Sequence, residues 1–285
     1  MKNIIVTGAR GLLGSHLVDL LARDHRVFAL GRGAPEQAEG NVVPIVADLS
    51  RPLDAGLLPE RIDSVVYLAQ SRRFREFPEG AADVRQINVD QPLALIEAAR
   101  QRGAGAFVYA STGSVYAASD EPLREESPLG ASGFYAASKR AAELLLEPYE
   151  ALMSVAALRF FFIYGPGQKS DMLIPRLIGN VREGRPVTLQ GESGLILNPI
   201  HARDAARAVA AALDLPRGGV INVAGPESLS IRELCDLAGR KLGRDPVYEV
   251  DAKASAPRLA ADISRMKALL GEPTIRFEEA LAELV

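Results

Sequence analysis

Tyr135 and Lys139 are the residues whose types and spacing most directly suggest acid–base chemistry. They stand four positions apart in "SGFYAASKRAAELL", residues 132–145, a stretch with the composition of a helix. Residues four apart lie on the same face of a helix, so the phenol and the ammonium are expected to be neighbours. A tyrosine has an ordinary pKa of about 10 and is a poor base near neutrality, but a positive charge beside it stabilises the phenolate. Such a pair also occurs by chance on ordinary surfaces, so its meaning depends on the elements that position it.

Three glycines stand between the first expected strand, residues 3–8, and a helix that follows at once. In "TGARGLLGSH" they are Gly8, Gly11 and Gly14. At this place the first glycine permits a tight turn, the second lets a pyrophosphate approach the main chain, and the third lets the helix pack on the strand. The N-terminus of the helix adds free N–H groups and the positive end of its dipole. The motif therefore predicts a dinucleotide site rather than a purely structural turn.

The end of the second expected strand indicates which dinucleotide binds. NAD sites commonly carry Asp or Glu there, about 20 residues further on, to bind the ribose hydroxyls. This chain has Gly31 and Arg32 instead. Because the repulsive carboxylate is missing and a guanidinium matches a phosphate, we expect NADP more than NAD. The alternative is that Arg32 is a solvated loop residue and that other contacts hold NAD. Asp48 and Leu49, at the end of the third strand, are expected beside the adenine ring.

Short apolar segments alternate with helical patterns through the first half of the chain. The expected strands are residues 3–8, 26–31, 42–48, 64–69 and 106–111. Continuous apolar strands separated by amphipathic helices predict a parallel sheet with both faces covered. The expected fold class is therefore α/β, a doubly wound parallel sheet (Rossmann) with a smaller, mainly C-terminal α/β substrate lobe.

The alternation weakens after about residue 165, which predicts a second unit. We expect a dinucleotide-binding domain over residues 1–165, with elements that return to it at about 199–224. Residues 166–198 and 225–285 are expected to form the substrate lobe. Further predictions are helices over 88–102 and 136–151, one apolar strand over 156–167 and a helix that Ser230 caps.

The composition limits the classes of partner. Lys and Arg total 33 against 36 Asp and Glu, a net charge of -3, so no general basic field is present to hold nucleic acid or an anionic membrane. The single cysteine, Cys235, excludes an internal disulfide and a multi-cysteine zinc site, and no metal is expected. No segment has the apolar length of a signal peptide or a membrane span. We expect a soluble cytoplasmic protein whose partners are small molecules.

Three motifs occur together in this chain. They are Gly8-x-x-Gly11-x-x-Gly14, hydroxyl residues in "YASTGSVYA" (109–117) at the end of a strand, and Tyr135-x-x-x-Lys139. The combination resembles the extended short-chain dehydrogenase/reductases, specifically the NAD(P)-dependent epimerase/dehydratase group that acts on nucleotide sugars. The resemblance continues through "LRFFFIYGPGQ", "NPIHARDAARAV" and "ADISRMKALLG", and so covers almost the whole chain.

The resemblance implies a proton transfer coupled to a hydride transfer. Tyr135 is the implied general base or acid, Lys139 lowers its pKa and binds the nicotinamide ribose, and Thr112 hydrogen-bonds the reacting oxygen. Asn88 is implied to hold the active-site helix, and the family implies a homodimer. The expected cofactor contacts are Gly8, Gly11, Leu12, Leu13, Gly14, Arg32, Asp48, Leu49, Leu68, Ala69, Asn88, Tyr135 and Lys139. The expected substrate contacts are Ser111, Thr112, Phe162, Asn180, Leu197 and Arg258.

Several positions depart from the family pattern. Dehydratases of the group usually carry Asp-Glu after the threonine, where this chain has Gly113 and Ser114. We therefore expect epimerisation or ketone reduction rather than dehydration. The family also tends to have Asn in place of Phe162 and Arg near Leu197, and both positions are apolar here. This departure leaves open a reductase of a non-nucleotide aldehyde or ketone, or a dehydratase, and less plausibly a dinucleotide-binding scaffold without catalysis.

Overall fold

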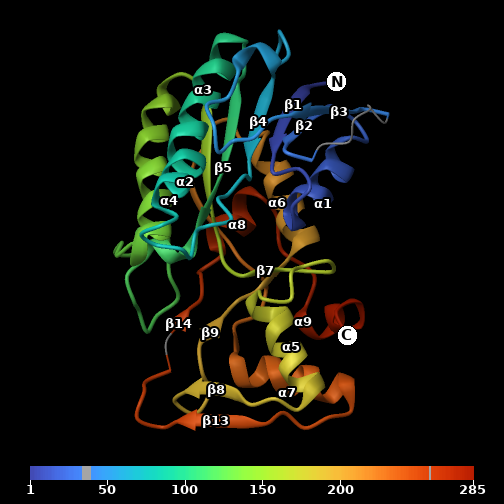
Figure 1. Ribbon diagram of the computed structural model, residues 1–285, viewed down its shortest axis with the longest axis vertical. Helices are drawn as coiled ribbons and strands as arrows, with labels where there is room; N and C mark the ends of the chain where they lie inside the picture. Colours follow the sequence, from blue (N-terminus) through green and yellow to red (C-terminus); the bar gives the residue numbers. More distant parts are fainter. Residues whose placement is uncertain (34–39, 257) are drawn as a thin grey trace.

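A seven-stranded parallel sheet forms the centre of the molecule in this computed structural model, which describes residues 1–33, 40–256 and 258–285 (Figure 1). The strand order is β11-β6-β5-β4-β1-β2-β3, and every neighbouring pair is parallel. The strands are β1 (Asn3–Thr7), β2 (Arg26–Gly31), β3 (Val42–Val46), β4 (Ser64–Tyr67), β5 (Ala106–Thr112), β6 (Ser154–Phe160) and β11 (Gly219–Val223). The predicted doubly wound sheet is confirmed.

Helices cover both faces of this sheet (Figure 1). One face carries α1 (Leu12–Leu21), α6 (Ala202–Ala212) and α8 (Ser264–Leu269), and the other carries α2 (Ala81–Arg85), α3 (Gln91–Gln101) and α4 (Gly133–Leu146). Because each strand is buried on both faces, alternate residues of one strand enter different cores: Val108 of β5 packs with α1 and α6, and Phe107 packs with α3 and α4.

The helix expected over residues 88–102 begins earlier and contains a π-helical turn. Gln86–Asp90 forms a π-helix between α2 and α3. Such turns disturb the regular hydrogen-bond ladder, and here two buried phenols contact the turn's carbonyl groups. Tyr67 donates to the carbonyl of Ile87 at 2.5 Å, and Tyr109 donates to that of Asn88 at 2.8 Å. The two sheet residues thereby fix the position of Asn88.

The remaining elements form a smaller lobe below the sheet (Figure 1). Its helices are α5 (Leu173–Glu183), α7 (Ile231–Leu242) and α9 (Phe277–Ala280), and its strands are β8 (Val187–Gln190), β9 (Ile196–Leu197), β12 (Leu229–Ser230), β13 (Tyr248–Asp251) and β14 (Arg258–Leu259). Short 3-10 turns occur at Ala55–Leu57, Gly113–Val115, Glu147–Ala151 and Leu281–Glu283. Ser230 caps α7 as predicted: its hydroxyl accepts from the N–H of Glu233 at 3.2 Å in a complete capping box. The division of the chain near residue 165 stays a prediction.

The single strand predicted over residues 156–167 is wrong, because the chain breaks at two phenylalanines. Strand β6 ends at Phe160, and the two-residue strand β7 (Ile163–Tyr164) pairs with β10 (Ile200–His201) outside the main sheet. Phe162 has a φ of +48°, in the left-handed region that a bulky side chain rarely adopts. The apolar composition gave no signal of this break.

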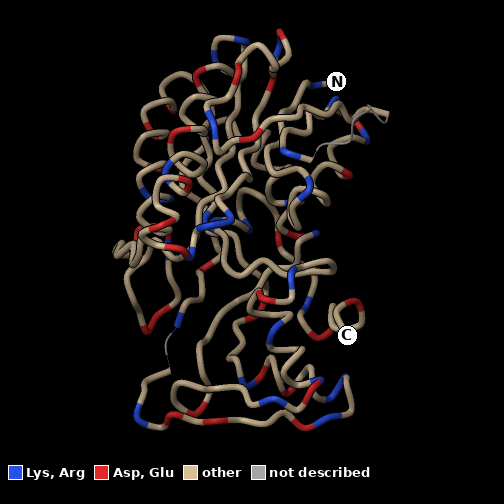
Figure 2. Tube along the Cα trace, viewed as in Figure 1, with Lys and Arg blue, Asp and Glu red and all other residues tan. Residues whose placement is uncertain are grey.

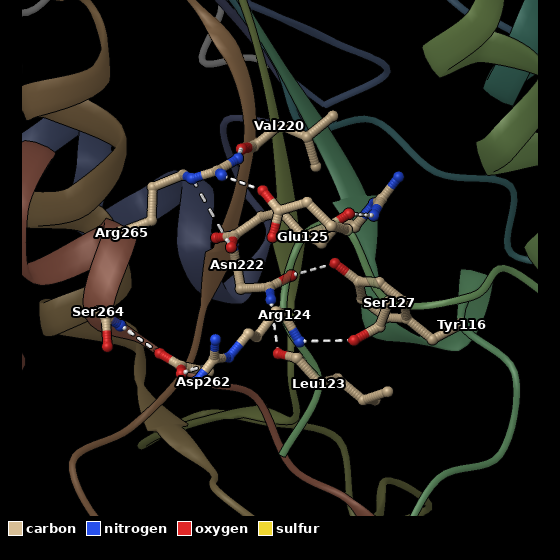
Figure 3. Close-up of polar contacts among 12 residues, drawn as sticks. Tyr116, Leu123, Arg124, Glu125, Ser127, Val220, Asn222, Asp262, Ser264 and Arg265 are labelled. Atoms are coloured by element: carbon tan, nitrogen blue, oxygen red, sulfur yellow. Dashed lines mark hydrogen bonds and ion pairs between the residues drawn. The ribbon is translucent and has the colours of Figure 1, made fainter. Parts of the chain in front are cut away.

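The segment that closes the chain returns to the main sheet (Figure 3). The Arg265 side chain donates to the Val220 carbonyl at 3.1 Å and lies 3.7 Å from the Glu125 carboxylate. Asn222 accepts from the Tyr116 phenol at 2.7 Å and donates to the Leu123 carbonyl at 2.9 Å. These contacts join α8, β11 and the segment between β5 and α4 into one polar cluster.

Charges of both signs are interspersed along the chain (Figure 2). This distribution agrees with the small net charge of -3. Among the described residues, no helix combines the length and the apolar composition needed to cross a bilayer.

Candidate functional site

The glycine loop has the geometry that the sequence predicted. Gly8 has a φ of +67°, and its carbonyl accepts from the N–H of Gly11 at 2.8 Å. A Cβ added to Gly14 would lie 2.2 Å from the same carbonyl oxygen, so a side chain there is excluded. The loop therefore brings the first turn of α1 directly against the end of β1, which is the arrangement that a dinucleotide phosphate needs.

A cleft of about 970 Å³ opens in front of this loop. Its walls come from the carboxyl ends of β1 to β4 and from the segment that precedes α5. Residues that line it include Gly8, Gly11, Leu12, Arg32, Asp48, Leu49, Leu68, Ala69, Gln70, Phe74, Arg75 and Gln168. Most of the cofactor residues predicted from the sequence thus share one cleft. The predicted residues that do not line it are Leu13, Gly14, Asn88, Tyr135 and Lys139, and the Leu13 side chain lies in the core between α1 and the sheet.

The end of the cleft at β2 and β3 carries two guanidinium groups and one carboxylate. Arg32 and Arg10 both line it, and Arg10 donates to the Gly33 carbonyl. The backbone N–H of Ser50, with a contribution from the charge of Arg32, lowers the pKa of Asp48. A carboxylate and nearby cations suit the hydroxyls and phosphates of an adenosine group. Arg10 was not predicted, because it stands at a variable position inside the glycine motif.

Lys139 lies buried one helical turn from Tyr135 on α4. Only 1% of its surface is exposed, its Nζ donates to the Ala110 carbonyl at 2.8 Å, and it lies 4.8 Å from the centre of the Tyr109 ring. Burial lowers the pKa of Lys139 to about 7, although the carboxylate of Glu143 acts in the opposite direction. The ammonium is thus held close to its titration point.

Tyr135 stands where α4 meets the cleft. Its hydroxyl donates to Oε1 of Gln70 at 3.3 Å, and its ring packs against Phe74 with centroids 5.3 Å apart. Burial raises the pKa of Tyr135 to about 12, and a hydrogen bond with Thr112 acts against that rise. Because Gln70 and Phe74 both line the cleft, the phenol lies at its end, with Thr112 beside it.

Asn88 links the π-helix to α4. It is fully buried, its amide donates to the Ser138 hydroxyl at 3.1 Å, and its carbonyl oxygen accepts from the N–H of Ser71 at 3.3 Å. Ser138 in turn donates to the Tyr135 carbonyl at 2.7 Å. These contacts place Asn88 as a support for the helix that carries Tyr135 and Lys139.

Two of the predicted substrate contacts point elsewhere. The Ser111 hydroxyl donates to the buried carboxylate of Glu143, so it is occupied inside the fold. Leu197 has no exposed surface and packs in the core of the lobe. Hydrophobicity alone does not distinguish a core residue from the wall of a pocket, so the sequence could not show that Leu197 is buried.

The other predicted substrate residues are scattered. Asn180 lies near the end of α5, where its side chain contacts the Pro186 carbonyl and Arg185, and it does not line the cleft. Arg258 lies in β14 beside β9. Phe162 is half-buried and packs against the lobe core. Their contact with substrate stays a prediction.

The loop "SRRFREF", residues 71–77, is part of the site rather than only a solvated connection. Phe74 covers Tyr135, and Arg75 stacks on Phe74 with its guanidinium carbon 5.0 Å from the ring centre. Arg75 also lies 3.8 Å from Asp171 across the cleft. In the sequence, the run of arginine and phenylalanine directly after a strand indicates this contribution to the site. No sequence pattern points to Gln70, the residue before the run.

His201 has a structural position. Its Nδ1 accepts from the N–H of Arg203 and so caps α6. Within residues 1–33, 40–256 and 258–285, no cluster of His, Cys, Asp and Glu has the arrangement of a metal site.

Comparison with known proteins identifies the family. Residues 4–224 match the NAD dependent epimerase/dehydratase family. The chain belongs to this family. It is 32% identical over 79% of its length to a UDP-glucuronate 4-epimerase from Thermodesulfobacterium geofontis, covering 72% of that protein. It is 31% identical over 99% of its length to a dTDP-glucose 4,6-dehydratase from Streptomyces griseus, covering 93% of it.

A solved structure of the same epimerase/dehydratase fold is closely similar. The UDP-glucuronic acid 4-epimerase from Bacillus cereus, in complex with UDP-glucuronic acid and NAD, superposes with a TM-score of 0.86 at 26% identity. The match covers 99% of this chain and 97% of that one. The resemblance deduced from the motifs is confirmed, and the chain is an enzyme of the nucleotide-sugar epimerase/dehydratase family.

One position sets this family member apart from the dehydratase pattern. A Cβ added to Gly113 would lie 2.5 Å from Cε1 of Phe161. The Phe161 ring, which stacks on Tyr116 with centroids 6.2 Å apart, therefore fills the space that a side chain after Thr112 needs. An aspartate at position 113 does not fit without displacing this ring.

Proposed function

We propose that the enzyme is an NAD(P)-dependent nucleotide-sugar epimerase or ketoreductase, with Tyr135, Lys139 and Thr112 as its catalytic residues. The observation that carries the proposal is the position of the Tyr135 hydroxyl. It donates to Gln70, which lines the glycine-loop cleft, Thr112 lies close enough to lower its pKa, and Lys139 follows one helical turn later on α4.

A bound nicotinamide supplies the hydride acceptor or donor. Thr112 orients the reacting oxygen of the sugar, and Tyr135 moves the proton at that oxygen. With a pKa of about 12 the phenol is protonated at rest, which suits donation to the oxygen of a ketone. In the opposite direction the phenolate must be stabilised, and the Lys139 ammonium is the cation of this chain placed to do so. Epimerisation uses both directions at one carbon.

The geometry beside Thr112 argues against dehydration. Elimination of water needs a positioned acid and base, which the dehydratases of the family usually carry after the threonine. Gly113 has no side chain, and the Phe161 ring occupies that space. Ser114 only exchanges hydrogen bonds with Thr112, at 3.2 and 3.3 Å.

A reductase of a non-nucleotide aldehyde or ketone is the second candidate. The observation that favours it is the aromatic character of this side of the site, where Phe161, Phe162 and Tyr116 pack together. Leu197 no longer supports it, since that side chain is buried in the lobe.

The preference for NADP and the homodimer remain parts of the proposal. The solved relative contains NAD. Arg32, exposed at the end of the cleft, supports binding of a 2′-phosphate. Leu144 and Leu145, two half-exposed leucines on α4, support pairing of this helix with a second copy. Sedimentation that shows only monomer at micromolar concentration would remove the dimer.

Incubation with nucleotide sugars tests the function. The dinucleotide that copurifies is identified by mass spectrometry, and the enzyme is then incubated with UDP- and dTDP-linked hexoses, uronic acids and 4-ketohexoses. We expect epimerised or reduced sugar nucleotides. Consumption of NADPH with simple aldehydes or ketones, and none with any sugar nucleotide, would instead support the second candidate.

A further inference from the structure

Helix α4 carries a third ionisable residue at the interval that separates Tyr135 from Lys139. Glu143 follows Lys139 by four residues, so the three side chains lie on one face of the helix. Its side chain is 2% exposed. A buried carboxylate without partners costs several kcal/mol, so its partners need to be identified.

Four hydrogen bonds from three residues satisfy Glu143. Arg159 of β6 donates from Nε at 2.9 Å and from its terminal nitrogen at 2.7 Å, a bidentate pair in which both side chains are 2% exposed. Arg140 donates to the second oxygen at 2.9 Å, and the Ser111 hydroxyl donates to the first. Burial acts to raise the pKa of Glu143, but these donors outweigh it and the pKa is lowered.

The ion pair is anchored to the rest of the fold. The Arg159 guanidinium lies 4.7 Å from the centre of the Tyr116 ring, and it donates to the Glu125 carbonyl at 3.4 Å. Tyr116 and Glu125 belong to the polar cluster that holds β11 and the closing segment (Figure 3). The carboxylate therefore has a fixed position relative to the sheet.

Glu143 affects the candidate site in two ways. Ser111 is the residue before Thr112 at the end of β5, so its bond to Glu143 ties the end of this strand to α4. The charge that acts on Lys139 is the carboxylate of Glu143, and the guanidinium groups of Arg140 and Arg159 bond to the same carboxylate. The other groups near Lys139 are neutral: Tyr109 of β5, a phenol whose pKa burial raises, and Asn88, which contacts the neighbouring Ser138.

We propose that Glu143 is a positioning residue of this enzyme: its carboxylate keeps the buried Lys139 ammonium protonated and holds the strand end that carries Thr112. The inference rests on the proposed function of Tyr135 and Lys139. Well-packed apolar residues commonly replace such pairs without loss of stability, so stability alone does not require a carboxylate at this position.

Titration of Lys139 tests this role without requiring activity. NMR of protein labelled with 13C-lysine follows the Lys139 side chain against pH, and its signal is assigned by its absence in Lys139→Arg. We expect the wild-type pKa near 7 and a fall of about one unit or more in Glu143→Gln, as Coulomb's law gives for charges one helical turn apart. The matched control is Glu147→Gln, which removes an exposed carboxylate one turn further along and leaves the pKa of Lys139 unchanged.

Two further variants test the proposal if Glu143→Gln does not fold. Glu143→Asp keeps the charge and should keep the pKa of Lys139 close to that of the wild type. The double variant Glu143→Gln/Arg159→Met removes both charges together, and a smaller fall is expected. A Lys139 pKa within about 0.3 units of wild type in folded Glu143→Gln overturns the proposal, and so does a fall of about one unit in Glu143→Asp, which keeps the charge. If the pKa falls but no variant or wild type turns over a sugar nucleotide, the proposed function fails and the role of Glu143 stands.

Discussion

The glycine-loop side of the cleft and the smaller lobe are built from very different lengths of chain. On the glycine-loop side, one stretch from Gly8 to Gly14 makes the turn and the contact between helix and strand. The lobe assembles β9, β12 and β14 from segments that lie far apart in the sequence, and its core combines residues from Tyr164 to Leu281. Local geometry is encoded in local sequence, whereas the position of a lobe residue depends on segments distant along the chain.

The largest expected effect concerns Tyr135, which stands between the glycine-loop cleft and the rest of the candidate site. Tyr135→Phe removes the proton carrier but keeps the ring that packs on Phe74, so turnover should fall by about 10³-fold or more while dinucleotide affinity changes little. Steady-state kinetics and cofactor titration measure the two quantities, with Tyr149→Phe as a control on the same side of the molecule. Turnover close to that of the wild type would refute the catalytic role.

The next largest effect concerns the glycine loop. In Gly14→Ala the new Cβ meets the Gly8 carbonyl oxygen at 2.2 Å, so α1 must move away from β1. We expect dinucleotide affinity to fall by roughly 100-fold, measured by calorimetry. Gly105→Ala is the control, since nothing lies within 4 Å of a Cβ there. Equal affinities in the two variants would show that the contact is not required.

Leu197→Ala tests the lobe. Because Leu197 is fully buried, its truncation should lower the free energy of unfolding by about 2 kcal/mol or more, measured by urea denaturation. The KM for substrate should change by less than about threefold in the fraction that is folded. A large rise in KM with unchanged stability would restore Leu197 to the substrate site.

The smallest effect concerns the choice of dinucleotide. Arg32→Ala removes the guanidinium at the end of β2, so the KM for NADP should rise by about tenfold, equivalent to 1.4 kcal/mol, while that for NAD stays unchanged. Initial rates with each cofactor measure the difference. If neither KM changes, Arg32 is a solvated loop residue and the prediction of NADP is lost.

The predictions from sequence succeeded where neighbouring residues determine structure. The five strands, the glycine loop and the Ser230 cap all depend on short-range patterns. The π-helix at Asn88 was missed, since it depends on phenols from β4 and β5 that donate hydrogen bonds to its carbonyl groups. The break at Phe162 was missed as well, because its backbone conformation is imposed by packing between two cores.

The residues of the candidate site also fall into two groups, those that the local sequence indicates and those that tertiary contacts bring in. Tyr135 and Lys139 were predicted together because one helix carries both. Gln70 and Glu143 were not predicted, since their contacts come from folding of the loop after β4 and of β6 against α4. Ser111 was assigned to the substrate because its partner, a buried carboxylate 32 residues away, is invisible in the local sequence.

A crystal structure of the enzyme with its dinucleotide and a sugar nucleotide tests the central claim most directly. We expect the reacting carbon of the nicotinamide and the Tyr135 hydroxyl to converge on one carbon–oxygen bond of the sugar at about 3–3.5 Å, with Lys139 against the nicotinamide ribose. A nicotinamide ring bound away from Tyr135, with the phenol still on Gln70, would contradict it.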